Sequence, residues 1–212
     1  MIKAAIVLLV LAGMASAVRA QDASAGRSKA AMCMGCHNIP GYQASFPLVH
    51  KVPKIGGQNA DYLVAALVAY RKGERKHPTM RAAAASLSDR DIADLAAFYA
   101  GSAPAAPAAA TAAAAPAAVA PLLERGACAS CHGADFNRPI APAYPKIAGQ
   151  HGDYLLAALR AYGSTNHRQI GRSNPIMSAQ VQPFSAAELR AIAGYVASLP
   201  GDVRTVPESR FR

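Results

Sequence analysis

Apolar residues recur at helical spacing in several stretches of the chain. They stand three, four and seven positions apart, which places them on one face of an α-helix. The clearest faces comprise Leu63, Ala66, Leu67 and Tyr70, then Ile92, Leu95, Ala96 and Tyr99, and finally Leu189, Ile192, Ala193 and Val196. Further helices are predicted over residues 24–31, 122–129 and 152–162. No stretch alternates between polar and apolar residues long enough to indicate a strand, so the pattern predicts an all-α protein.

Two of these helices begin at a recognisable start signal. Ser88 stands three residues before Asp91, and Ser185 stands three residues before Glu188. A serine followed three residues later by an acidic residue forms a capping box, in which each side chain satisfies a free backbone N–H of the first helical turn. The two final helices are therefore expected to start directly after these serines.

The two halves of the chain repeat each other. Matching segments occur in the same order, and they pair residues 33–37 with 128–132, 53–58 with 145–150, 61–67 with 153–159, Tyr70 with Tyr162, and Met80 with Met177. Such ordered matches indicate a duplication. We therefore expect an N-terminal domain over residues 21–100, a C-terminal domain over 122–200 and a polar tail over 201–212.

The segment between the repeats, residues 101–121, consists almost entirely of alanine and proline. These two residue types fill 17 of its 21 positions, and none is charged. Because recurrent proline blocks a continuous helix, a semi-stiff extended linker is predicted. A helix packed on one domain is the alternative.

The N-terminus has the pattern of a secretory signal peptide. Lys3 provides a positive start, residues 4–13 are apolar, and small residues follow, so that cleavage after Ala17 or Ala20 is possible. A signal over residues 1–20 predicts a periplasmic protein. A buried N-terminal helix and an uncleaved membrane anchor are the alternatives. The uncharged run between Lys3 and Arg19 is shorter than the roughly 18 residues of a spanning helix, so we expect no transmembrane span after cleavage.

Composition narrows the class of protein. The chain has 212 residues, 22 Lys and Arg against 12 Asp and Glu, a net charge of +10 and 52% hydrophobic residues. These values exclude an acidic disordered chain and a collagen-like one. Nucleic acid is not an expected partner, because no ladder of aromatic residues accompanies the positive charge. Domains of this size without tryptophan need an additional apolar filler to build a core.

All four cysteines lie in two Cys-x-x-Cys-His motifs, formed by Cys33, Cys36 and His37 and by Cys128, Cys131 and His132. This spacing is typical of covalent c-type haem attachment. Cysteines at i and i+3 of a helix lie on one side, where two sulfurs can bond the two vinyl groups of a haem, and the adjacent histidine can reach the iron. Two haem c groups are therefore predicted. A zinc site and redox-active disulfides are the alternatives.

Each iron needs a second axial ligand, and elimination favours methionine. Met1 and Met14 belong to the predicted signal, and Met32 and Met34 flank Cys33 too closely to reach the opposite face of the same haem. Met80 and Met177 are left, 43 and 45 residues after their histidines, in proline-marked loops. We predict that they are ligands, although a methionine can also simply fill a core.

Histidine is the competing ligand type. The four other histidines, His50, His77, His151 and His167, do not occupy equivalent repeat positions and are expected to face solvent. His77, three residues from Met80, is the main rival. The carbonyls of Pro53 and Pro145 are candidates to accept a hydrogen bond from the ligating histidines. Alternatively, these prolines only delay the following helix.

Basic residues crowd the segment around Met80. They comprise Arg71, Lys72, Arg75, Lys76 and Arg81, with a sparser group, Arg168 and Arg172, before Met177. They form either a solvated face or a rim that attracts a negatively charged redox partner.

On these motifs, the chain resembles the di-haem cytochrome c4 family. The resemblance rests on the two haem motifs, the two Pro-Lys-Ile-x-Gly-Gln segments, the Tyr-Leu-x-Ala-Ala-Leu helices and the two methionine segments, and it covers nearly the whole mature chain. It implies two tandem class I cytochrome c domains, each with helices wrapped round one His/Met haem. It also implies a periplasmic electron carrier between a quinol-oxidising complex and a terminal oxidase or reductase. The long linker departs from the family's short connection, so the resemblance leaves open whether the two lobes pack together.

The expected function is therefore electron transfer by Fe(II)/Fe(III) cycling, without substrate chemistry. The strongest alternatives are a di-haem peroxidase-like enzyme and the cytochrome subunit of a periplasmic dehydrogenase. An enzyme would need a displaceable haem ligand and a substrate pocket, and the sequence shows no acid–base pair near either methionine.

Overall fold

The structure is a computed structural model that describes residues 21–102, 114–164 and 167–207. The predicted signal peptide, most of the alanine- and proline-rich linker and the last five residues lie outside this range.

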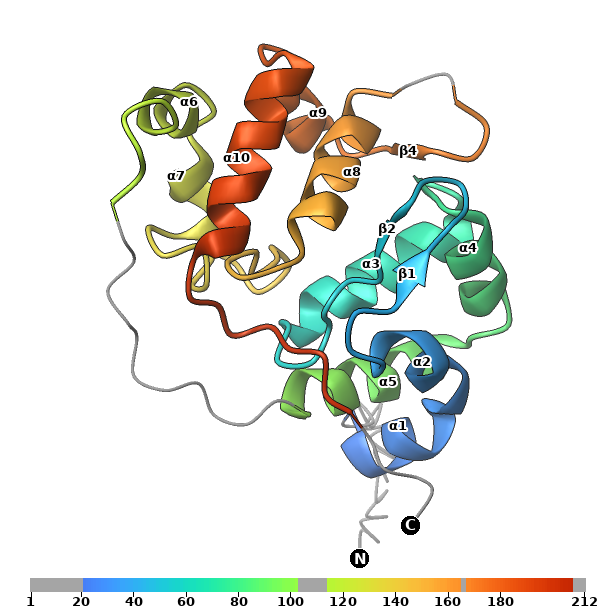
Figure 1. Cartoon of the computed structure of the whole chain (residues 1–212). Coiled ribbons are helices and arrows are strands. Elements are labelled where there is room, and N and C mark those ends of the chain that lie inside the picture. Colours follow the sequence, from blue (N-terminus) through green and yellow to red (C-terminus); the bar gives the residue numbers. More distant parts are fainter. Residues whose placement is uncertain (1–20, 103–113, 165–166, 208–212) are drawn as a thin grey trace, which may run out of the picture.

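The described residues form two helical lobes (Figure 1). Lobe one holds α1 (Ala23–Lys29), α2 (Ala31–His37), β1 (Gln43–Ala44), β2 (His50–Lys51), α3 (Ala60–Lys72), β3 (Arg75–Lys76), α4 (Pro78–Ala85) and α5 (Asp89–Gly101). Lobe two holds α6 (Ala120–Arg125), α7 (Cys128–His132), α8 (Gly152–Tyr162), β4 (Gly171–Arg172), α9 (Pro175–Val181) and α10 (Ala186–Ser198). The all-α prediction is confirmed, because every strand is only two residues long.

Several helix boundaries differ from the predicted ones. The stretch predicted as one helix over 122–129 is split, because Ala127 adopts a left-handed conformation (φ 43°) between α6 and α7. Helix α6 begins at Ala120, inside the segment assigned to the linker. The capping boxes at Ser88 and Ser185 are both present and start α5 and α10 as predicted.

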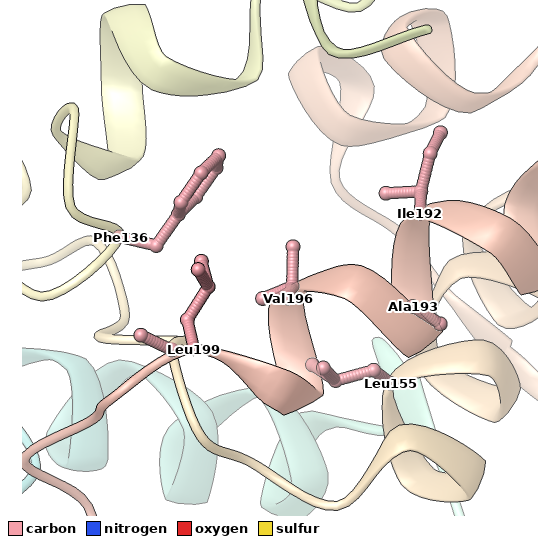
Figure 2. Close-up of a cluster of buried hydrophobic side chains, with 7 residues drawn as sticks. Phe136, Leu155, Ile192, Ala193, Val196 and Leu199 are labelled. Atoms are coloured by element: carbon pink, nitrogen blue, oxygen red, sulfur yellow. The ribbon is translucent and has the colours of Figure 1, made fainter. Parts of the chain in front are cut away.

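Each lobe has its own apolar core under its last helix. In lobe one, α5 contributes Leu95, Ala96 and Tyr99, which pack with Ala30, Met34 and Leu63. In lobe two, α10 contributes Ile192, Ala193 and Val196, which pack with Phe136, Ala148, Leu155 and Leu199 (Figure 2). The apolar faces found in the sequence are therefore the core faces of these helices.

The first helix is held to the last helix of lobe one by a close crossing and a buried carboxylate. Asp94 on α5 is 1% exposed and pairs with Lys29 at 2.7 Å and with Arg90 at 2.9 Å. It also accepts a hydrogen bond from the backbone N–H of Asp22 at 3.0 Å. These bonds hold the pKa of Asp94 low, at about 2, with the Lys29 hydrogen bond as the main cause.

The lobes are joined by a reciprocal set of hydrogen bonds, which answers the question that the long linker left open. Gln150 of lobe two bonds both backbone groups of Lys54, donating from Nε2 to its carbonyl at 2.8 Å and accepting from its N–H at 2.9 Å. Gln58 of lobe one bonds both backbone groups of Lys146 in the same way, at 2.9 Å each. These four hydrogen bonds therefore hold one lobe against the other.

Two further elements cross between the lobes. Strands β3 and β4 pair in antiparallel register, with Arg75 opposite Arg172. The segment after α10 runs back to lobe one (Figure 1), where Arg204 and Gly56 exchange backbone hydrogen bonds at 3.0 and 2.8 Å. The described part of the predicted polar tail, residues 201–207, is thus a strap across the interface, and Val203 within it is fully buried.

Within the described residues, no helix combines the length and the apolar character needed to cross a membrane.

The close crossing of α1 and α5 yields a stability prediction. A Cβ on Gly26 would lie 2.0 Å from the Asp94 carbonyl oxygen and 2.8 Å from Phe98 Cβ. Gly26→Ala should therefore push the helices apart and lower the free energy of unfolding by about 1–3 kcal/mol. Thermal unfolding followed by circular dichroism measures this. Gly194→Ala is the matched control, because it lies in a helix with no atom within 4 Å of the new Cβ. It should raise stability by about 0.5–1 kcal/mol. Equal effects of the two substitutions would contradict the packing.

Candidate haem-binding sites

Both Cys-x-x-Cys-His motifs lie on short helices. Helix α2 carries Cys33, Cys36 and His37, and helix α7 carries Cys128, Cys131 and His132. All four cysteines are half-buried. The helical conformation puts the two sulfurs of each motif on one side, as covalent attachment to one porphyrin requires.

The two motif histidines have the same fixed orientation. His37 Nδ1 lies 2.9 Å from the carbonyl oxygen of Pro53, and His132 Nδ1 lies 3.1 Å from that of Pro145. A carbonyl only accepts, so Nδ1 carries the proton in both rings and Nε2 keeps its free lone pair. Burial lowers the pKa of both histidines, so both imidazoles are neutral. A neutral, oriented imidazole with a free Nε2 is ready to ligate a metal.

The alternatives to haem fit these residues less well. A structural zinc site needs four nitrogen or sulfur ligands, whereas each motif supplies only two cysteines and one histidine. Among the described residues, no group of three or more His, Cys, Asp or Glu side chains is placed to hold a metal ion. The cysteines also form no disulfide. Each motif therefore supplies the two thiols and the one neutral imidazole that a covalently attached haem uses.

Met80 and Met177 occupy equivalent places, but in short helices rather than in loops. Met80 is the third residue of α4 and Met177 the third residue of α9, and both are half-buried. Each helix begins with a proline after a side-chain cap: His77 Nδ1 accepts from the N–H of Met80, and Asn174 Oδ1 accepts from the N–H of Met177. The expectation of loops is wrong because these caps start a helix at once.

The four other histidines were expected to face solvent, but only His167 is exposed. His50 is 7% exposed and packs edge-on against Tyr154 of lobe two, with ring centres 5.8 Å apart. His77 is half-buried, and burial lowers its pKa to about 4. Since Nδ1 of His77 caps α4, only its other ring nitrogen is left for another role. His167 is exposed as expected, and His151 is half-buried.

Arg75 and Arg172 belong to the interface rather than to an exposed rim. Arg75 donates to Tyr62 Oη at 3.2 Å and across the interface to Tyr154 Oη at 2.7 Å. Arg172 also donates to Tyr154 Oη, at 3.2 Å. Although burial raises the pKa of Tyr154, the two guanidinium groups lower it to about 7. Both arginines therefore have to be removed from the predicted docking rim.

This cluster was missed by sequence reasoning, although a signal existed. Four tyrosines surround the two arginines, through a hydroxyl group or through the face of the ring. They are two pairs of equivalent positions in the repeat, Tyr62 with Tyr154 and Tyr70 with Tyr162. Arg75 Nε is buried without a hydrogen-bond partner among the described residues. A buried and a half-buried guanidinium group side by side, with one unpartnered N–H donor, suit a ligand that bears carboxylates.

Comparisons with known proteins agree with this geometry. The Cytochrome c family model matches residues 117–200. Cytochrome c4 of Azotobacter vinelandii is 30% identical over 93% of this chain and 99% of its own length. A thiosulfate dehydrogenase electron acceptor of Stutzerimonas stutzeri is 31% identical over 82% of each chain.

A solved structure shares the fold of most of the chain. The crystal structure of reduced cytochrome c4 from Pseudomonas stutzeri aligns with a TM-score of 0.62 and 24% identity, over 85% of this chain and all of that one. This likeness shows the shared fold, and the relative that is 30% identical over nearly its whole length shows the family. The chain belongs to the di-haem cytochrome c4 family of electron-carrying c-type cytochromes, whose cofactor is covalently bound haem c.

Proposed function

We propose that the chain is a periplasmic carrier whose two haems have His37 with Met80 and His132 with Met177 as axial ligands. The observation that supports this most directly is the repeated pair of imidazoles, each fixed by a proline carbonyl with Nε2 free. Haem with His and Met ligands supplies a reversible one-electron Fe(II)/Fe(III) couple, with a higher potential than a bis-histidine haem.

The residues of each lobe have separate roles in this proposal. The two cysteines anchor the cofactor, and the histidine is held in one tautomer by its proline carbonyl. The caps His77 and Asn174 fix the helices that carry the methionines. Arg75 and Arg172 have the chemistry to hold the haem carboxylates between the lobes. The hydrogen bonds of both arginines go to tyrosine hydroxyls, and Arg75 Nε is buried without a partner among the described residues, so haem carboxylates would supply the opposite charge.

We propose a quinol-oxidising complex as donor and a terminal oxidase or reductase as acceptor. A second candidate is the cytochrome subunit of a periplasmic dehydrogenase. It is favoured by the relative named thiosulfate dehydrogenase electron acceptor, which matches 82% of this chain. Both functions use the same two haems and differ only in the protein that delivers the electrons. A peroxidase-like enzyme would instead need a displaceable ligand, and carbon monoxide binding by the reduced protein would indicate one.

Partner docking is proposed to use the exposed cations near Met80. Lys72 and Arg81 are exposed, whereas Arg71 is bound to Asp89 and Lys76 donates to the His167 carbonyl. The proposed docking surface therefore consists of Lys72 and Arg81. The charge of Arg71 is partly neutralised by Asp89, and Lys76 is held by its hydrogen bond to His167. Exposed cations steer a negatively charged partner by raising the association rate.

Replacement of the axial methionines tests the ligand assignment. Met80→Ala and Met177→Ala should each remove about half of the weak near-infrared methionine–iron absorbance of the oxidised protein, because each lobe contributes one such bond. The double variant should lose all of it. An unchanged band in the single variants would contradict the assignment and direct attention to His77 and His167.

Charge reversal tests the docking surface. Arg81→Glu should slow oxidation of the reduced protein by hexacyanoferrate(III), a negatively charged oxidant, severalfold at low ionic strength, and the difference should shrink as salt is added. Stopped-flow absorbance measures the rate. Arg190→Glu, the same charge change at an exposed position of α10, is the control. If both variants slow the reaction equally, net charge rather than this surface steers the partner.

A further inference from the structure

The proline carbonyl that holds each motif histidine belongs to a peptide group whose other end is bound by the opposite lobe. In lobe one, the Pro53 carbonyl accepts from His37 Nδ1 at 2.9 Å. The N–H of the same peptide group, that of Lys54, donates to Gln150 Oε1 at 2.9 Å. One peptide group therefore stands between the histidine of lobe one and a glutamine of lobe two.

Lobe two repeats this arrangement. The Pro145 carbonyl accepts from His132 Nδ1 at 3.1 Å, and the N–H of the same peptide group, that of Lys146, donates to Gln58 Oε1 at 2.9 Å. Gln58 and Gln150 are equivalent positions in the repeat, and each is only 4% exposed. Each lobe therefore contains the same chain of hydrogen bonds, from its histidine through one peptide group to a glutamine of the other lobe.

The orientation of both glutamine amides is fixed by their surroundings. Each Oε1 also accepts from the N–H of the following residue, Asn59 or His151, and each Nε2 donates to a backbone carbonyl of the other lobe. Swapping oxygen and nitrogen would place donors against donors and acceptors against acceptors. The oxygen therefore faces the peptide N–H in both lobes.

Hydrogen bonds at the two ends of a peptide group strengthen each other. When the N–H donates, amide resonance moves electron density to the carbonyl oxygen, which becomes a better acceptor, and the effect is larger in a buried, low-dielectric site. A better acceptor draws the imidazole proton and gives the ring more imidazolate character, so Nε2 becomes a stronger electron donor to a bound metal. A stronger donor favours Fe(III) over Fe(II).

We propose that Gln150 and Gln58 are positioning residues, each of which tunes the proximal histidine of the opposite lobe through one shared peptide group. The inference rests on the proposed function, in which His37 and His132 ligate the haem irons. It makes the potential of each haem depend on a side chain of the other domain, and therefore on a closed interface. A partner that parts the lobes would raise both potentials.

The matched variants Gln150→Met and Gln58→Met test this proposal. Methionine has nearly the shape of glutamine but cannot form the hydrogen bonds of its side-chain amide. Spectroelectrochemical titration gives both potentials, which are assigned to lobes by Met80→His and Met177→His, each of which lowers the potential of its own lobe. Gln150→Met should raise the potential of the lobe-one haem more than that of lobe two. Gln58→Met should show the opposite pattern. In the reduced, diamagnetic protein, the Nδ1 proton of the affected histidine should move upfield as its hydrogen bond weakens.

Asn59→Ala is the control for general loosening of the interface. It removes the bond from Asn59 Nδ2 to the Tyr144 carbonyl, at 2.9 Å, which crosses the lobes without touching either histidine-bound peptide group. It should leave the two potentials and both Nδ1 protons in place. Small-angle X-ray scattering on each variant shows whether the lobes have parted.

Two results would overturn the inference. Equal shifts of both potentials in each glutamine variant would show that the glutamines act only by holding the lobes together. Unchanged potentials with intact hydrogen bonding to the histidines would show no coupling through the peptide group. Failure of the proposed function looks different, because the unsubstituted protein would then lack a pair of titratable c-type haems.

Discussion

The hydrogen bond from a histidine Nδ1–H to a proline carbonyl is the interaction on which the rest of the structure depends. It sets the tautomer of His37 and His132, leaves Nε2 free, and restrains the rotation of each ring. A small lobe rich in alanine has little side-chain volume with which to fix a ring by packing alone. A backbone acceptor within the repeated segment does this without demanding a large core.

The same repeated segment also builds the interface, and this links the two lobes more closely than their covalent connection does. In each of the two segments, 53–58 and 145–150, the proline carbonyl accepts a hydrogen bond from the motif histidine of the same lobe. The following lysine binds the glutamine of the other lobe through its backbone N–H and carbonyl groups. Paired strands β3 and β4 and the strap at Arg204 add to this contact. The two haem motifs therefore stand in one fixed arrangement, whatever the length of the linker.

Local patterns in the sequence were sufficient to predict the helices, the duplication and the haem motifs. Periodicity, capping serines and cysteine spacing are each defined within a few residues of the chain. The interface could not be predicted in this way. Gln58, Gln150 and the paired tyrosines were visible as matches between the repeats, but their partners in the other lobe lie more than 70 residues away. Arg75 shows the same limit: it stands among exposed basic residues in sequence and is 8% exposed in the fold, because β3 pairs with a strand of the other lobe.

The central claim is that each lobe holds one covalently attached haem, bound by the cysteines and the oriented histidine of its motif. Haem content of the purified protein, matured in a host that attaches haem c and measured by the pyridine haemochrome spectrum, tests it most directly. The account predicts two c-type haems per chain, with Cys33→Ala and Cys36→Ala together reducing the content to one. Colourless protein, or content unaffected by loss of both lobe-one cysteines, would contradict it.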